Sequence, residues 1–205
     1  MPDFQIVQAV THELRRQIFE TLTTAAGVAF QLPSVDRISL AAPDVASGDS
    51  ALASLYLYHI DIDPHLRNQR PIPDINDDSR FHRPPLPLRM RYLLTPLDDD
   101  DADNQVVLGL VLQHLQDNPS FGVIDGDVID DSHGAVPARI KVRFEPMALD
   151  AQTNLWNAFS TPMRLAITLH VEVVAIDPAK APQATPRVDQ TILGTRRKDL
   201  EVADG

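Results

Sequence analysis

The chain has no cysteine, which excludes disulfide bonds and thiolate metal sites from its 205 residues. It also lacks any run approaching the ~18 consecutive apolar residues that a membrane-spanning helix needs. Its first residues show no charged segment followed by an apolar run, so the sequence predicts no secretory signal. These absences fit a soluble protein made in a reducing cytoplasm, with no direct insertion into a membrane.

Sequence signatures of several enzyme classes are missing as well. The chain contains no GxSxG, HExxH, GxxxxGK[ST] or GxGxxG motif. Its net charge of -11 would repel a phosphate backbone, which argues against general nucleic-acid binding. We therefore expect no enzymatic activity, no cofactor and no nucleic-acid partner.

Glycine is scarce, with eight residues, whereas proline is frequent, with seventeen. Because proline fixes φ and donates no backbone hydrogen bond, its clusters at 71–87 and 178–186 mark loops or extended linkers. After residue 177 the composition turns to proline, alanine and charge. We therefore predict a core domain over 1–177 and a proline-rich C-terminal extension over 178–205.

Three segments have helical periodicity. Residues 4–23 carry one apolar stripe at three- and four-residue steps, and Asp3 is the predicted N-cap. Residues 103–116 carry a second stripe, and 149–159 form a short helix that presents Trp156 to the core. The first stripe consists of Val7, Val10, Leu14, Ile18 and Leu22, and the second of Val107, Leu108, Val111, Leu112 and Leu115.

Strands outnumber these helices and do not alternate with them, so the fold class is α+β. The predicted strands lie at 37–40, 52–60, 86–94, 139–144 and 164–176. The strand at 52–60 is apolar on both faces, which predicts a place in the middle of a sheet. The predicted core face of the last strand consists of Leu165, Ile167, Leu169, Val171 and Val173.

The remaining segments read as loops. Residues 42–50 are small and polar, and 61–85 form a long polar loop of a length that is often functional or disordered. Residues 121–136 are weakly patterned, with room for a short strand or helix. The fragment 188–193, VDQTIL, resembles a strand; it would either add to a neighbouring sheet or belong to a disordered tail.

Two groups of acidic residues and histidines are candidate metal sites. His59, Asp61, Asp63 and His65 alternate, but Pro64 breaks the strand before the fourth ligand. A strand end that turns into a loop is the simpler reading. The acidic run at 98–103 lacks the glycine and distal glutamate of a calcium loop, and carboxylates before a helix favour its dipole. We expect helix capping there and no metal at either place.

Two strands carry basic rows on this acidic chain. Arg89 and Arg91 share one face of a strand, as do Arg139, Lys141 and Arg143 on another. One interpretation is a solvated face. The other is an interface at which these residues meet acidic neighbours in a stacked ring and fix its register.

Three segments together resemble one family. They read SLYLYHIDIDPHLRN (Ser54 to Asn68), RPPLPLRMRYLLTP (Arg83 to Pro96) and LWNAFSTPMRLAITLHVEVVAID (Leu155 to Asp177). In order and spacing they are similar to the cap, or tail-terminator, proteins of extracellular contractile injection systems, which are phage-tail-like particles of bacteria. With the opening helix, the resemblance covers roughly residues 4 to 177.

This resemblance implies a mixed, mainly antiparallel sheet flanked by about three helices, as in phage tail terminators. It implies a structural protein, six copies of which form a ring on the distal end of the particle. The ring would end growth of the inner tube and hold the last ring of the sheath. Its partners would be further copies of itself and the tube and sheath proteins. It would assemble in the bacterial cytoplasm and stay part of the particle, including any particle that is released. An adaptor that recruits cargo or a regulator to the particle is the alternative.

Overall fold

A computed structural model of the protein describes residues 4–25, 30–65, 70–74, 77, 79–124, 126–128, 139–179, 181 and 183–184. Its helices are α1 (Ile6–Thr24), α2 (Pro43–Ala46), α3 (Asp101–Asp117) and α4 (Leu149–Ala158). The longer strands are β2 (Ala53–Ile62), β5 (Leu86–Pro96), β9 (Ile140–Phe144) and β10 (Ile167–Ile176). The short strands are β1 (Ile38–Ser39), β3 (Ile72–Pro73), β4 (Arg80–His82), β6 (Ser120–Phe121), β7 (Val123–Ile124), β8 (Asp127–Val128) and β11 (Gln183–Ala184).

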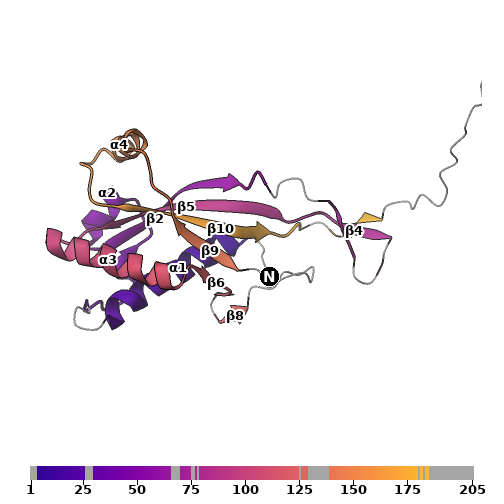
Figure 1. The fold of residues 1–205 in the computed structure, drawn as a ribbon, viewed down its shortest axis with the longest axis horizontal. Coiled ribbons are helices and arrows are strands. Elements are labelled where there is room, and N and C mark those ends of the chain that lie inside the picture. Colours follow the sequence, from indigo (N-terminus) through magenta and orange to yellow (C-terminus); the bar gives the residue numbers. More distant parts are fainter. Residues whose placement is uncertain are drawn as a thin grey trace, which may run out of the picture.

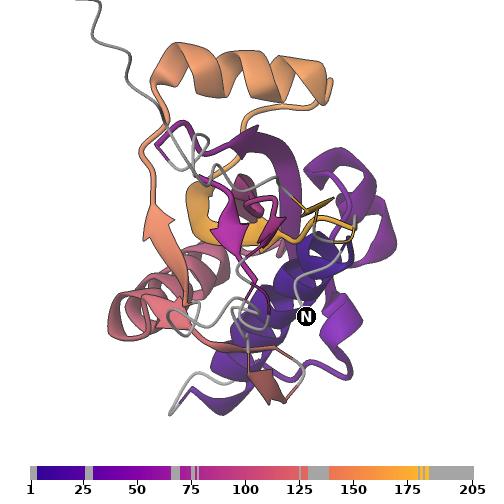
Figure 2. The same cartoon turned by 90° about the vertical axis from the view of Figure 1, so that its right-hand side faces the viewer.

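A six-stranded sheet in the order β1-β2-β5-β10-β9-β6 organises the molecule. Only the β1–β2 pair is parallel among its described neighbours, and the other pairs are antiparallel. In Figure 1, α1 and α3 lie on one side of the sheet and α4 lies on the other. Figure 2 shows the same three layers along the length of the molecule. The predicted α+β class, with a mainly antiparallel sheet, is confirmed.

Helix α1 buries the stripe that its sequence predicts. Val10, Leu14, Ile18 and Leu22 are fully buried against the sheet, and Val7 packs at the margin of the same core. The helix begins at Ile6, two residues later than expected, and its N-cap is Gln5, whose side chain makes no capping hydrogen bond. The predicted cap, Asp3, lies outside the described residues.

Strand β5 is the centre of the sheet, between β2 and β10. Its residues Leu88, Met90, Tyr92 and Leu94 alternate onto the helix-covered face and are buried. Leu86, which the same alternation places on that face, is 43% exposed because it lies at the far end of the strand. Leu112 of α3 is likewise more exposed than its stripe suggests.

Helix α4 is anchored to the opposite face through aromatic contacts. Trp156 is buried, and its ring meets that of Phe159 edge-on at 5.8 Å between centroids. Phe159 in turn meets Tyr56 of β2 edge-on at 5.7 Å. The apolar residues on the second face of β2 therefore pack against α4.

The expectation that β2 lies in the middle of the sheet is wrong for most of its length. Strand β1 pairs only with Ala53 and Ser54. On that side, residues 55–62 pair with no described strand. A strand that is apolar on both faces can thus lie at an edge, because the helix on its second face buries the extra apolar residues.

Two bulges flank β5. In β2 the register with β5 shifts between Leu57 and His59, and in β10 it shifts between Val171 and Val174. The shift brings Val174 opposite Leu88, and Val174 is buried. Strict alternation had predicted Val173 for the core; its side chain lies outside the described part. Leu165, also predicted for the core, precedes the strand and is 54% exposed.

Beyond the bulges the sheet continues as what we call the outer sheet: residues 59–62 of β2, 86–90 of β5 and 174–176 of β10. It leads toward the arm, a second sheet in the order β11-β4-β3 (Figure 1). The supposed loop at 61–85 is therefore partly ordered as strands. Strand β11 lies within the predicted C-terminal extension and pairs with β4, whereas residues 188–193 lie outside the described part.

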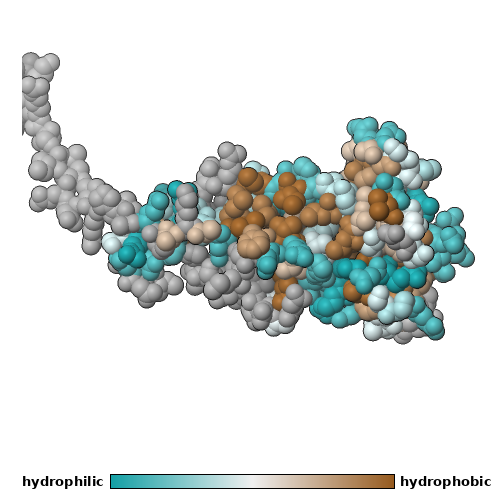
Figure 3. Space-filling view, turned by 180° about the vertical axis from the view of Figure 1, so that it is seen from behind, coloured by the Kyte–Doolittle hydropathy of each residue, from teal (hydrophilic) through white to brown (hydrophobic). Residues whose placement is uncertain are grey.

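Two other predicted loops also contain regular structure. Residues 42–50 form α2 and a 3₁₀ helix at Ser47–Asp49, because Pro43 at the first position favours a helical start. The weakly patterned stretch after Phe121 contains β7 and β8, which pair with each other. Figure 3 shows hydrophobic surface gathered over the middle of the molecule, between the arm and the helical body.

Candidate functional site

The basic row of β5 is paired within the chain. Arg89 Nε lies 3.0 Å from Asp63 Oδ2, just beyond the end of β2. Arg91 Nε lies 3.1 Å from Glu145 Oε2, and Arg91 Nη1 lies 3.9 Å from Asp61 Oδ2. Both guanidinium groups are therefore largely neutralised by neighbouring strands, which leaves less of their charge for a partner.

The basic row of β9 divides into paired and unpaired members. Arg143 Nη1 lies 3.5 Å from Glu172 Oε2 of β10. Lys141 and Arg139 are exposed, and neither forms an ion pair with another described residue. Arg139 lies just before β9 rather than on it. These two side chains are the ones in the predicted rows whose charge is most available.

Strand register joins the two rows across the sheet. His59 of β2 lies opposite Arg91, Arg91 opposite His170 of β10, and His170 opposite Arg143 of β9. The row holds two arginines among imidazole rings, and carboxylates interleaved between them offset the charge of the arginines. The carboxylates that do so are Asp61, Glu145 and Glu172. The sequence could predict each face but not this row, because register is a non-local property.

His170 is the buried member of this row. Its Nδ1 lies 3.6 Å from Glu172 Oε1 and 3.9 Å from Glu145 Oε2. Only about a tenth of its side chain is exposed. The charged face thus has a buried centre at β10 and exposed ends at β2 and β9.

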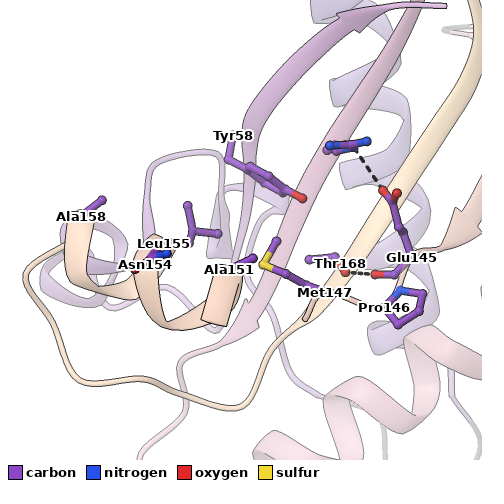
Figure 4. Close-up of a pocket in the computed structure, with 10 residues that line it drawn as sticks. Tyr58, Glu145, Pro146, Met147, Ala151, Asn154, Leu155, Ala158 and Thr168 are labelled. Atoms are coloured by element: carbon purple, nitrogen blue, oxygen red, sulfur yellow. Dashed lines mark hydrogen bonds and ion pairs between the residues drawn. The ribbon is translucent and has the colours of Figure 1, made fainter. Parts of the chain in front are cut away.

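A pocket of about 520 Å³ opens between α4 and this charged face (Figure 4). Its lining residues are Tyr58, Arg91, Glu145, Pro146, Met147, Ala151, Asn154, Leu155, Ala158 and Thr168. The α4 side is mainly apolar, and the sheet side carries the Arg91–Glu145 ion pair. The Thr168 hydroxyl donates to the backbone carbonyl of Glu145, which fixes the loop at the pocket wall.

Tyr58 is the bulge residue of β2 and points into this pocket (Figure 4). Burial raises the pKa of its hydroxyl, Arg91 opposes the rise and Glu145 adds to it. The phenol is therefore a neutral hydrogen-bonding group at physiological pH. Together with Asn154, it gives the pocket polar groups that can orient an amphipathic side chain or peptide.

The alternating His and Asp residues after Tyr58 do not converge. His59 Nε2 pairs with Asp61 Oδ2 at 2.9 Å, whereas Asp63 pairs with Arg89 and accepts the backbone N–H of His65 at 2.8 Å. The last contact is a turn, as the Asp63-Pro64 sequence predicts. Across the described residues, no group of three or more such side chains is placed to hold a metal ion.

The acidic run before α3 caps that helix, as predicted. Asp100 is the N-cap, and its Oδ1 accepts the N–H of Ala102 at 2.7 Å. Asn104 and Asp98 close the turn with two reciprocal hydrogen bonds, of 2.9 and 3.0 Å. Asp101 and Asp103 lie in the first turn, where the dipole favours carboxylates.

Comparison with solved structures places this fold among terminators of contractile particles. One match is the sheath/tube terminator of PVC, an extracellular contractile injection system, in its extended state. It is 19% identical, with a TM-score of 0.54, and the match covers 96% of this chain and 65% of that one. Another is the tube-terminating cap of the anti-feeding prophage, AFP. It is 20% identical, with a TM-score of 0.54, and the match covers 91% of this chain and 60% of that one.

Residues 8–190 match the family model of the Pvc16 N-terminal domain. The chain belongs to this family, as its resemblance to cap proteins predicts. It spans less than two thirds of the length of the solved terminators that it matches. No curated protein sequence matches it. No helix in the described part of the chain is both long and apolar enough to cross a bilayer.

Proposed function

We propose that this protein is a structural cap on the distal end of a contractile injection particle. The observation that carries the proposal is the family match over 8–190, together with a fold shared with a sheath/tube terminator and a tube-terminating cap. The names of these solved structures describe structural components, which supports a structural role rather than an enzymatic one.

In this proposal, six copies form a ring that binds the last ring of the inner tube and holds the last ring of the sheath. A tube of stacked identical rings exposes a binding surface after every addition. Growth ends when a ring binds that surface but offers no matching surface on its other side. The net charge of -11 supports this role, because like-charged outer faces repel further stacking.

Lys141 and Arg139 are the basic residues that we propose for contacts in the ring, with Arg89, Arg91 and Arg143 as supporting members. The first two are exposed and lack an ion pair with the described residues. The others already have acidic partners within the chain. A neighbouring acidic surface would gain most from the first two.

The protein would assemble in the bacterial cytoplasm and remain part of the particle, including any particle that is released. Its partners would be further copies of itself and the tube and sheath proteins, without nucleic acid. Residues 1–177 would form the capping domain and 178–205 an extension.

The test is the length distribution of particles from cells with and without this gene, measured by electron microscopy. A cap predicts overlong tubes, or sheaths that detach, in the deletion strain. A plasmid copy of the gene should restore the sharp length. Particles of normal length with attached sheath in the deletion strain would reject the cap and favour the adaptor.

A further inference from the structure

Among the described residues, the outer part of β2 forms an unpaired sheet edge with exposed apolar side chains. Beyond the bulge at Tyr58, residues 59–62 pair with β5 on one side and with no described strand on the other. Ile60 and Ile62 are 45% and 49% exposed there. Such an edge presents backbone donors and acceptors that can pair with a further strand.

Natural edges of this kind are usually protected by charge, proline or a covering loop. The Tyr58 bulge protects the inner part of the edge, because it interrupts the ladder at the point where β2 leaves the helical body. The four residues after it have no such protection on the Ile60 face from any described residue. Their opposite face holds His59 and Asp61, paired with each other at 2.9 Å.

The cross-strand neighbours extend the apolar surface at this edge. Ile62 lies opposite Leu88, and Leu86 lies opposite Ile176 of β10. Leu86 is 43% exposed. A strand added beside β2 would therefore place alternate side chains next to an existing apolar row, which is the pattern of specificity in strand addition.

We propose that residues 188–193 of a neighbouring copy, VDQTIL, add as a strand to residues 59–62 of β2. Within this segment, Val188 and Ile192 are four residues apart and would project on the same face of a strand. When one of them lies beside Ile60 or Ile62, the other projects from the same face of the added strand. The opposite side chains would face the Tyr58 side of the sheet.

The length and charge of the chain support this occupant. The segment begins four residues after Ala184 of β11, and four extended residues span roughly 13 Å, so it would bind a neighbouring copy whose outer sheet lies beside the arm. The fragment is flanked by Arg187 on one side and by Arg196, Arg197 and Lys198 on the other, on a chain of net charge -11. A basic segment is thus attracted to the acidic surface of the next copy.

This strand addition rests on the proposed function in one respect: the ring supplies the neighbouring copy that it requires. It would link adjacent copies in the ring through their backbones. Such links tolerate small differences in side-chain packing, because main-chain hydrogen bonds supply much of the affinity.

The test uses a labelled peptide of residues 185–198 and the full chain carrying Ile192→Pro, so that its own segment cannot pair. Fluorescence anisotropy would measure binding up to about 1 mM, the effective concentration that a short tether provides. Hydrogen exchange followed by mass spectrometry would report backbone pairing. We expect saturable binding and slower amide exchange in residues 55–62.

Matched variants distinguish this edge from general attraction. Ile62→Lys should raise the Kd of the peptide by roughly tenfold or more, because the ammonium group would lie against apolar side chains. Val123→Lys, at a site that is 45% exposed on β7, should leave the Kd unchanged. A scrambled peptide of the same composition controls for charge. Thermal unfolding of each variant shows that it remains folded.

Absence of saturation, equal binding of the scrambled peptide or unchanged exchange in residues 55–62 would each overturn the inference. If the peptide fails but these residues become protected in intact particles, the edge belongs to another particle protein and the tail is rejected as its occupant. These results come from the purified chain, whereas the cap function is tested by particle length. Either proposal can therefore fail while the other stands.

Discussion

Tyr92 of β5 and Thr11 of α1 are joined by a 2.7 Å hydrogen bond between their hydroxyl groups. The Thr11 hydroxyl donates its proton to the carbonyl oxygen of Val7 at 2.8 Å, so Tyr92 is the donor to Thr11. Both side chains are buried. This pair is therefore a buried polar link between the central strand and the first helix.

Removing either hydroxyl should destabilise the protein, but unequally. Tyr92→Phe leaves Thr11 bonded to Val7 and should cost about 1 kcal/mol in the free energy of unfolding. Thr11→Val leaves the buried Tyr92 hydroxyl with only the Met90 sulfur at 3.8 Å and should cost about 2 kcal/mol. Urea unfolding measures both values. The double variant should be no less stable than Thr11→Val; simple additivity of the two losses would contradict a direct link.

Tyr92 should also make stability depend on pH in the alkaline range. Burial raises the pKa of its hydroxyl from about 10 to about 12. Between these values the unfolded chain releases a proton that the folded chain retains, so stability falls as pH rises from about 10 to about 12. The full effect is about 2–3 kcal/mol.

Tyr92→Phe provides the comparison, because it removes this titration and leaves other alkaline effects in place. The stability advantage of the natural chain over the variant should shrink across that pH range. A constant difference from pH 9 to pH 12 would show that Tyr92 does not titrate as its burial requires.

The stability that the buried carboxylate of Glu13 contributes should depend on Arg16. Burial raises the pKa of Glu13. Hydrogen bonds from Arg16 and Gln17 and the charge of Arg16 together lower the pKa by more than burial raises it, so the net pKa is below its normal value. Stability from this group is present above the normal pKa and is lost as pH falls through the lowered one. Arg16 is half exposed, so Arg16→Ala should cost only about 1 kcal/mol at neutral pH.

That cost should become smaller at acidic pH, where Glu13 is protonated in both proteins. Chemical unfolding of the natural chain and Arg16→Ala at neutral and acidic pH measures the change. Arg15→Ala is unsuitable as a control, because Arg15 bonds to the backbone of Val35 and Ile38. Gln8→Ala, on the same helix, is the better choice. A cost that does not vary with pH would contradict the proposed coupling.

The cap of α3 offers a matched pair of substitutions. Asp100→Ala removes the acceptor for the N–H of Ala102 and should cost about 1 kcal/mol. Asp99→Ala removes the same charge one residue earlier, from an exposed side chain that is not the N-cap, and should cost much less. Thermal unfolding compares them directly. Equal losses would mean that charge, rather than capping, matters in this run.

Charge reversal tests the basic residues proposed for the ring. Lys141→Glu should lengthen particles or release sheath, because the substitution replaces an exposed cation with a carboxylate that an acidic neighbour would repel. Arg164→Glu makes the same kind of change at an exposed residue before β10 and should leave particle length normal. Electron microscopy of both strains is the measurement. Identical particles from the Lys141→Glu strain would remove this residue from the interface.

Local patterns predicted the parts of the fold in which one face is covered by the core. The stripe on α1, the alternation of β5 and the acidic cap of α3 each follow from short-range spacing or chemistry. The arm is not predicted because its strands are only two or three residues long, and β3 contains Pro73 while β11 directly follows Pro182. Such strands depend on partners far along the chain.

The candidate site shows the same division. Alternation placed Arg89 and Arg91 on one face, but their ion pairs with Asp63 and Glu145 depend on loops and register that the sequence does not display. The bulge in β10 likewise interrupts the strict alternation of side chains, and Val174 therefore lies in the core. Pairing energies between distant segments decide these details.

The paired bulges on either side of β5 separate two kinds of constraint on this molecule. On one side of them, substitutions must preserve the packing of α1 and α3 against the sheet. On the other side, the exposed residues of the outer sheet and arm can vary in charge and shape with little effect on that packing, whereas Leu88, Met90 and Val174 remain part of the core. Variation that matches the protein to a different neighbour can therefore accumulate at one end of the sheet while the stability of the fold is maintained at the other.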